Sequence, residues 1–223
     1  MPDKAVDLPE WVPLFPLPNV VLLPGAVLPL HIFEQRYRVM TADALRGDRL
    51  VAMALLADGW QRHYHNRPAI EPVVCVGEIV SHEQLPDGRY NFLLLGRRRA
   101  RVVKELGGKP YRLARLAPIE EKPAMEIDLE HDRARLREWF DGGALAGAPA
   151  AAHFAQLLAG PLPTPVIADV LAFNLIDDVR IRQELLAEPC VVRRVRRVVE
   201  CLGQMAALAR AAARAYPGDP ALN

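Results

Sequence analysis

A proline-rich stretch near the N-terminus constrains the fold of this chain more than any other segment. Residues 11–32 read WVPLFPLPNVVLLPGAVLPLHI, with prolines at positions 13, 16, 18, 24 and 29 among short runs of valine and leucine. Proline lacks the amide donor that a sheet ladder or a helix interior requires, so a helix is excluded here. The stretch is predicted to form short extended segments at sheet edges or bends, with Pro24-Gly25 at a turn between two of them.

Directly after this stretch the apolar periodicity becomes helical. Tyr37, Met40 and Ala44 recur at helical spacing within residues 34–47, and Gly47 ends the run. Short apolar or alternating runs separated by Gly and Pro turns then predict several strands. These runs are residues 50–57, 73–85, 90–95, 97–106 and 111–119. The pattern predicts a small closed or half-closed β-barrel with one inserted helix.

From about residue 121 the prolines become sparse and alanine becomes frequent. Helices are predicted at residues 128–141, 148–159, 163–175 and 179–187, and a longer one from Pro189. In the last helix an apolar stripe steps by three and four residues. Its members are Val192, Val195, Val199, Leu202, Ala206 and Ala209. We interpret the stripe as the core of a helical bundle, with a homodimer seam as the alternative.

The two halves together predict an α+β chain, with a β-rich part at residues 1–120 and a helical bundle at residues 121–223. Charge is nearly balanced, since the net charge is 16 − 13 = +3 for residues 1–120 and 12 − 14 = −2 for residues 121–223. A protein whose main partner is nucleic acid is expected to be far more basic.

Location follows from what the chain lacks. No run reaches the roughly 20 apolar residues of a membrane span, and the N-terminus lacks the layout of a signal peptide. The cysteines, at positions 75, 190 and 201, are widely spaced, which favours a reducing environment. We therefore expect a cytoplasmic protein that does not contact membranes.

Motifs for catalysis and cofactor binding are missing from the sequence. There is no phosphate-binding GxxxxGK[ST] loop and no GxSxG elbow, and the one serine, Ser81, lies in a Val-Ser-His context. His63 and His65 have the spacing of half a zinc site, but no third ligand accompanies them. We predict no catalytic residue, no cofactor and no metal; a metal-dependent enzyme or small hydrolase is the minor alternative.

Two groups of residues are candidates for contacting a partner. Arg97, Arg99 and Arg101 share one face of a predicted strand, which suits an acidic peptide or RNA phosphates. The second group is the aromatic residues Phe15, Phe33 and Tyr37. Beside proline-interrupted strands at a sheet edge they could hold an apolar segment of another chain. The alternative is that these rings fill the core between the strands and the inserted helix.

The segment VPLFPLPNVVLLPGAVLPLHIFEQRYRVM, residues 12–40, resembles the opening of the Lon protease N-terminal substrate-binding domain, especially the version in stand-alone bacterial LON-domain proteins. Further stretches agree with that family in order: GEI at 77–79, LGRRRARV at 95–102, ADVLAFNL at 168–175 and QELL at 183–186. The resemblance implies a PUA-like β pseudo-barrel with one inserted helix, followed by a C-terminal helical bundle.

In Lon proteases this domain precedes an ATPase module and a protease module, whereas the present chain ends at Asn223. The resemblance therefore implies a non-catalytic protein- or peptide-binding module of the Lon substrate-recognition type, without ATPase or protease activity. Its expected partners are polypeptide clients or a protein partner. An RNA-binding protein that uses the PUA-like barrel and its arginine row is the alternative.

Overall fold

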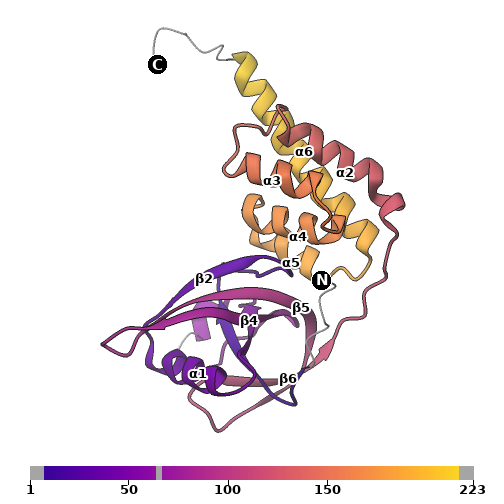
Figure 1. Cartoon of the computed structure of the whole chain (residues 1–223). Coiled ribbons are helices and arrows are strands. Elements are labelled where there is room, and N and C mark those ends of the chain that lie inside the picture. The colour runs from indigo at the N-terminus through magenta and orange to yellow at the C-terminus, as the bar shows by residue number, and fades with distance from the viewer. Residues whose placement is uncertain (1–7, 64–66, 216–223) are drawn as a thin grey trace. The chain divides into compact units, whose positions relative to one another are not determined.

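The computed structural model describes residues 8–63 and 67–215 (Figure 1). The chain is an α+β protein, as the sequence predicts, with a 6-stranded sheet and helices α1 to α6. It divides into two compact units. The first contains the residues up to Glu121 together with Asp177–Pro189, and the second contains Lys122–Ile176 and the residues from Cys190 onward.

All strands of the sheet lie in the first unit. They are β1 (Val12–Leu17), β2 (Val27–Ile32), β3 (Leu50–Leu55), β4 (Val73–Gln84), β5 (Tyr90–Leu106) and β6 (Arg112–Pro118). Helix α1 (Gln35–Arg46) follows β2, the short 3-10 helix η1 (Trp60–His63) follows β3, and helix α5 (Val179–Ala187) completes the unit. The prolines of residues 11–32 thus lie in two short strands and the segment between them. The predicted position at a sheet edge holds for β2 but is wrong for β1, which pairs with β3 and with β6.

The sheet has the strand order β2-β5-β4-β3-β1-β6, and β6 also pairs with β5. Because β6 pairs with both β1 and β5, the strands β5, β4, β3, β1 and β6 form a closed ring (Figure 1). β1 runs parallel to β3, and the other pairs are antiparallel. β2 stands outside the ring, paired with β5 at the edge of the sheet.

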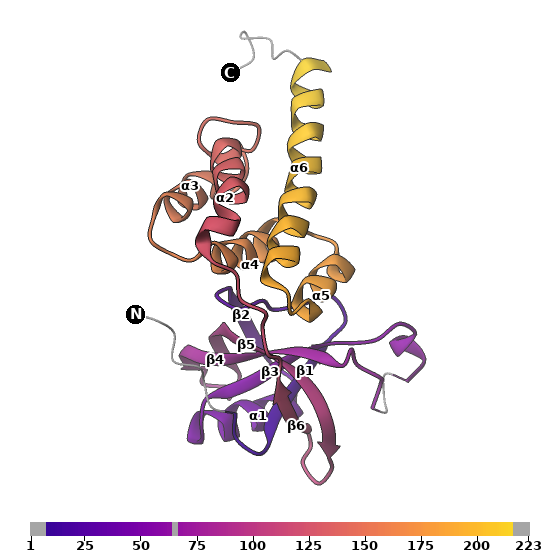
Figure 2. The ribbon, with the colours of Figure 1, turned by 90° about the vertical axis from the view of Figure 1, so that its right-hand side faces the viewer.

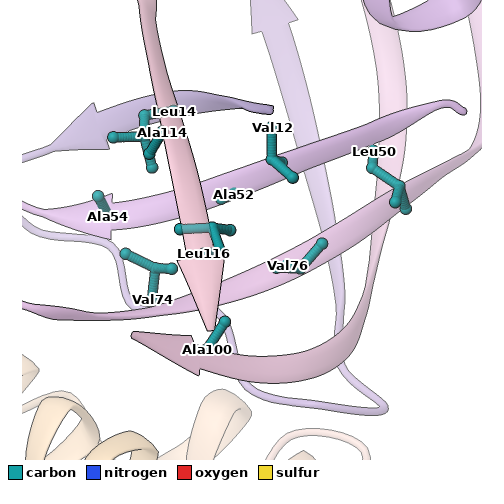
Figure 3. Packing of buried hydrophobic residues seen from close by; sticks show 10 residues of the cluster. All are labelled: Val12, Leu14, Leu50, Ala52, Ala54, Val74, Val76, Ala100, Ala114 and Leu116. Atoms are coloured by element: carbon teal, nitrogen blue, oxygen red, sulfur yellow. The ribbon is translucent and has the colours of Figure 1, made fainter. Parts of the chain in front are cut away.

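Small aliphatic side chains fill the interior of the ring (Figure 3). They are Val12, Leu14, Leu50, Ala52, Ala54, Val74, Val76, Ala100, Ala114 and Leu116. Alternate residues of each strand point inward, as the period of a strand requires. β3 is buried on both faces, since Val51, Met53 and Leu55 are buried as well. This explains why β3 is an uninterrupted apolar run instead of an alternating one.

Gly96 is the point at which the segment before β2 touches the ring. Its N–H donates to the carbonyl of Ala26 at 2.8 Å, and its carbonyl accepts from the N–H of Gly25 at 2.8 Å. A Cβ atom at Gly96 would lie 2.2 Å from the backbone oxygen of Leu23. The β4–β5 register shifts next to the Gly77–Gly96 pair. The bend or bulge predicted from this glycine is therefore present.

The second unit consists of α2 (Glu126–Phe140), α3 (Ala151–Ala159), α4 (Thr164–Leu175) and α6 (Val191–Ala215). α4 and α2 pack against α6, which is the longest helix of the unit (Figure 2). Val195, Val199, Leu202 and Ala206 of the predicted stripe are buried. Between α4 and α6, Arg194 Nε lies 3.3 Å from the Asp169 carboxylate, and both side chains are buried. No described helix has the length and apolar character needed to cross a bilayer.

Helix α5 differs from the other C-terminal helices, because it belongs to the first unit. Gln183 Nε2 donates to the carbonyl of Val73 on β4 at 2.9 Å. Arg180 pairs with Glu71 at 3.0 Å and also contacts Asp58. The predicted division at residue 120 assigned all later residues to one helical part. The structure instead places residues 177–189 with the strands, since α5 binds β4 and the segment after β3.

Candidate functional site

The edge strand β2 has backbone groups that do not take part in the sheet. Gly96 donates to Ala26, so the hydrogen-bonded positions along β2 continue at Leu28, Leu30 and Ile32. Val27, Pro29 and His31 occupy the alternate positions, where backbone N–H and C=O groups point away from β5. Pro29 therefore costs no ladder hydrogen bond, and β2 keeps an open edge within the described part of its unit.

Apolar side chains are exposed beside this edge. Val27, Val80 and Leu93 each expose 40–45% of their surface, and Phe33, directly after β2, exposes 63%. Pro29 stands opposite Leu93 on β5, and Val80 lies in the register shift between Ile79 and Ser81 on β4. We call Val27, Pro29, Phe33, Val80 and Leu93 the β2 surface. A shallow hollow of about 420 Å³ adjoins it and is lined by Pro29, His31, His82, Asn91 and Leu93, among others.

A polar cluster borders the β2 surface at the turn between β4 and β5. The Nδ1 atom of His31 lies 2.7 Å from Asn91 Oδ1, and Arg89 Nη1 lies 3.3 Å from His31 Nε2. Asn91 Nδ2 donates to Glu83 at 3.4 Å. The His31 ring also stacks with the Phe33 ring at a centroid distance of 6.3 Å, so this polar cluster orients the exposed aromatic side chain.

The structure separates the three aromatic residues predicted to contact a partner. Phe15 on β1 and Tyr37 on α1 are only 5% and 7% exposed, and their ring centroids lie 4.4 Å apart. These two rings therefore fill the core between β1 and α1, which is the alternative that the sequence left open. Phe33 is exposed and belongs to the β2 surface.

The predicted arginine row is interrupted by the register shift in β5. β4 pairs Gly77 with Gly96 and Val76 with Arg98, so Arg97 is the extra residue and strict alternation is lost. Arg97 pairs with Glu78 at 2.8 Å, and Arg99, which is 3% exposed, pairs with Glu121 at 3.0 Å. Arg101 is exposed. Two of the three arginines thus bind carboxylates within the unit, and one of them is buried.

A cavity of about 560 Å³ opens elsewhere in the first unit, between the end of β1, the start of α1, the segment after β3 and the β5–β6 hairpin. Aromatic rings, prolines and basic side chains line it. The lining residues are Pro16, Leu17, Pro18, Glu34, Arg36, Tyr37, Leu56, Trp60, Arg67, Pro68, Lys109, Pro110, Tyr111 and Arg112. Sequence reasoning missed this cavity, because its walls come from four segments that are far apart along the chain.

One wall of the cavity is fixed by Asp43 on α1. Its Oδ2 atom accepts hydrogen bonds from the Tyr111 hydroxyl at 2.8 Å and from Lys109 Nζ at 3.1 Å. The Tyr111 hydrogen bond, together with Lys109 and Arg46, holds the pKa of the Asp43 carboxyl below its usual value, although burial opposes this. Burial and the adjacent carboxylate raise the pKa of Tyr111 well above its usual value. Asp43 is therefore ionised and Tyr111 is protonated at neutral pH.

Within the described residues, no group of three or more His, Cys, Asp or Glu side chains is arranged to hold a metal ion. His65, from the half zinc site considered above, lies outside the described residues.

Comparison with known families and proteins identifies relatives that match most of the chain. The model of the substrate-binding domain of the ATP-dependent protease La (LON) matches residues 11–204. Lon protease of Dictyoglomus thermophilum is 28% identical over 200 residues, which cover 88% of this chain and 24% of the relative. Lon protease 2 of Myxococcus xanthus is 27% identical over 206 residues, which cover 89% of this chain and 24% of the relative. The chain thus spans about a quarter of these relatives.

Solved structures agree with the family match. The N-terminal domain of Mycobacterium avium complex Lon protease aligns with a TM-score of 0.67 and 15% identity, covering 86% of this chain and 97% of that structure. A Lon N-terminal domain protein from Xanthomonas campestris aligns with a TM-score of 0.60 and 23% identity, covering 85% of this chain and 97% of that structure. At these identities the likeness concerns the fold.

Proposed function

Since the chain belongs to the LON substrate-binding domain family, we propose that it binds protein substrates through the β2 surface and is not itself catalytic. The observation that supports this proposal is the coincidence of an open strand edge with exposed apolar side chains. Val27 and Phe33 flank the outward-facing backbone groups of β2, and Leu93 lies opposite Pro29. This combination suits an extended, apolar segment of an unfolded polypeptide.

Phe33 is expected to supply the largest single share of the binding energy. Its ring is more exposed than Val27, Val80 and Leu93, and covering an aromatic side chain contributes about 1.5–3 kcal/mol. The polar cluster around His31 and Asn91 lies beside it, and such a polar rim is typical of protein-binding surfaces. An apolar centre with a polar border favours chains that expose apolar residues over folded, polar surfaces.

Three finer features belong to the same proposal. The closed ring of strands with its inserted helix α1 is a PUA-like pseudo-barrel, and the second unit is a C-terminal helical bundle. The protein acts in the cytoplasm, which the separated cysteines favour. The proposal concerns the residues that match the substrate-binding domain, and the chain spans about a quarter of its Lon protease relatives.

RNA binding receives less support from the geometry. Arg97 and Arg99 pair with Glu78 and Glu121, so much of the predicted arginine row is compensated by carboxylates. A phosphate backbone is bound by accessible cations that release counterions.

The test is binding of a permanently unfolded protein, reduced and carboxymethylated lactalbumin, measured by fluorescence anisotropy. The Phe33→Ser variant is expected to bind about tenfold more weakly, from the loss of the buried ring. Leu208→Ser, which removes an equally exposed apolar side chain from α6, is the matched control and is expected to bind normally. Equal affinities of wild type and Phe33→Ser would contradict the proposal.

A further inference from the structure

The cavity beside α1 has the size and rigidity of a small-molecule site. Its volume of about 560 Å³ lies within the range of about 300–1,000 Å³ that is typical of ligand pockets. Pro16, Pro18, Pro68 and Pro110 line it, and proline restricts the backbone at each of these positions. It is separate from the β2 surface, because the residues that line the cavity and those that form that surface do not overlap.

Two of the aromatic rings in the cavity wall are held in place by partners behind them. The Tyr37 ring packs against the buried Phe15 ring at 4.4 Å, and Tyr111 is anchored through its hydroxyl to Asp43 at 2.8 Å. Trp60 contributes the third ring. Fixed aromatic faces in one pocket bind planar rings well, because little side-chain entropy is lost on binding.

The basic side chains of the cavity differ in how fully they are compensated. Arg112 makes a bidentate pair with Glu105, at 2.8 and 2.5 Å, and also donates to the carbonyl of Pro68. Lys109 pairs with Asp43 at 3.1 Å. These two cations are therefore engaged with carboxylates of the same unit.

Arg36 and Arg67 are the remaining cations of the cavity. Arg36 pairs with Glu34, the one acidic residue of the lining, at 2.9 Å. Arg67 has no carboxylate partner among the described residues, and its hydrogen bond there is a long one, 3.5 Å, to the carbonyl of Leu106. Each of the other cations has a carboxylate, so within residues 8–63 and 67–215 Arg67 is the cavity cation whose charge is not compensated.

We propose that this cavity binds a small organic anion in which a planar ring lies next to a carboxylate or phosphate group. Arg67 pairs with the anionic group, and the partly exposed Trp60 ring contacts the planar part. The buried Tyr37 ring, over which the Arg36 guanidinium lies at 4.6 Å, and the buried Tyr111 ring form the rigid wall behind it. This site goes beyond substrate binding at the β2 surface and does not depend on it. A carboxylate or a phosphate can supply the anion, and the two are distinguished experimentally.

The test follows the indole N–H signal of Trp60 in NMR spectra of the ¹⁵N-labelled 223-residue chain, with the signal assigned from Trp60→Phe. The probes are indole-3-acetate for a carboxylate and adenosine monophosphate for a phosphate. Indole alone is the control for the planar ring, and acetate and inorganic phosphate alone are the controls for the anionic group. We expect one of the two complete probes to shift the signal in a saturable way, at least about tenfold more tightly than indole.

Arg67→Gln is expected to weaken binding of the complete probe about tenfold and to leave indole binding unchanged. Arg101→Gln removes an exposed arginine outside the cavity and is the matched control. If neither complete probe shifts the Trp60 signal at millimolar concentration, the proposal is wrong. It is also wrong if indole binds as tightly as the complete probes, or if Arg67→Gln binds like wild type.

Discussion

The Tyr111 hydroxyl donates a 2.8 Å hydrogen bond to the Asp43 carboxylate, and this bond joins the end of the β5–β6 hairpin to helix α1. Lys109 of the same hairpin reaches the same Asp43 oxygen at 3.1 Å. Helix α1 is thereby attached to the ring of strands through polar contacts as well as through the Phe15–Tyr37 packing. The wall of the cavity depends on this attachment.

Tyr111→Phe is expected to lower the free energy of unfolding by about 1–2 kcal/mol, because the Asp43 carboxylate loses a hydrogen bond that a charge strengthens. Urea denaturation of wild type, Tyr111→Phe, Asp43→Asn and the double variant measures the coupling. The double variant should lose less stability than the sum of the single variants. Strictly additive losses would show that the two side chains do not stabilise each other.

The same contact predicts how stability depends on pH. The pKa of Asp43 is lower in the folded chain than its ordinary value of 3.8, so its contribution is fully present above that pH. The contribution is lost as the pH falls through the lowered folded pKa. The stability difference between wild type and Tyr111→Phe should therefore be largest near neutral pH and shrink as the pH falls below 3.8. Urea midpoints across this range test it, and a difference that grows on acidification would refute the assignment.

Gln183→Ala is expected to destabilise the first unit by about 1–3 kcal/mol, because the buried carbonyl of Val73 loses its hydrogen bond from α5. Gln204→Ala on α6 is the control, since Gln204 is exposed, and it should change stability by less than about 0.5 kcal/mol. Thermal and urea denaturation measure both. Equal stabilities of the two variants would mean that the contact between Gln183 and β4 contributes nothing.

Gly96→Ala is expected to lower the free energy of unfolding more than Gln183→Ala or Gln204→Ala does. The added Cβ would lie 2.2 Å from the Leu23 oxygen, a backbone atom that cannot move aside without displacing the segment that leads into β2. A loss of at least about 2 kcal/mol is predicted from this overlap. Gly147→Ala meets no atom within 4 Å and should leave stability nearly unchanged. A Gly96→Ala protein as stable as wild type would disprove the tight approach.

The periods of the sequence predict most of the elements, because inward-facing side chains in a ring of strands must alternate and those of helices must recur at 3.6 residues. They do not predict which face of β1 is covered by α1. Phe15 is buried because α1 lies on its side of the strand, and nothing within residues 11–32 specifies that helix's position. Tyr37 is buried for the same reason, because its ring faces β1.

Three further features of the structure differ from what the sequence predicts, because they depend on a single residue or on segments far apart along the chain. The register shift at Arg97 changes which way the following arginines point, and the only sign of it in the sequence is Gly96. The cavity could not be predicted, because Trp60, Arg67 and Tyr111 meet only when the ring closes. Helix α5 continues the helical pattern of its neighbours, yet Gln183 and Arg180 attach it to the first unit.

Unfolded protein substrates are proposed to contact the β2 surface at Phe33. The photo-reactive residue p-benzoylphenylalanine is placed at position 33, or at position 208 as the control. Labelled lactalbumin, reduced and carboxymethylated, is then added, and cross-linking to it is measured. Both side chains are largely exposed, at 63% and 71%. We predict that light produces a cross-linked product from position 33 that unlabelled lactalbumin suppresses, and little product from position 208. Equal cross-linking from both positions, or none from position 33, would contradict this account.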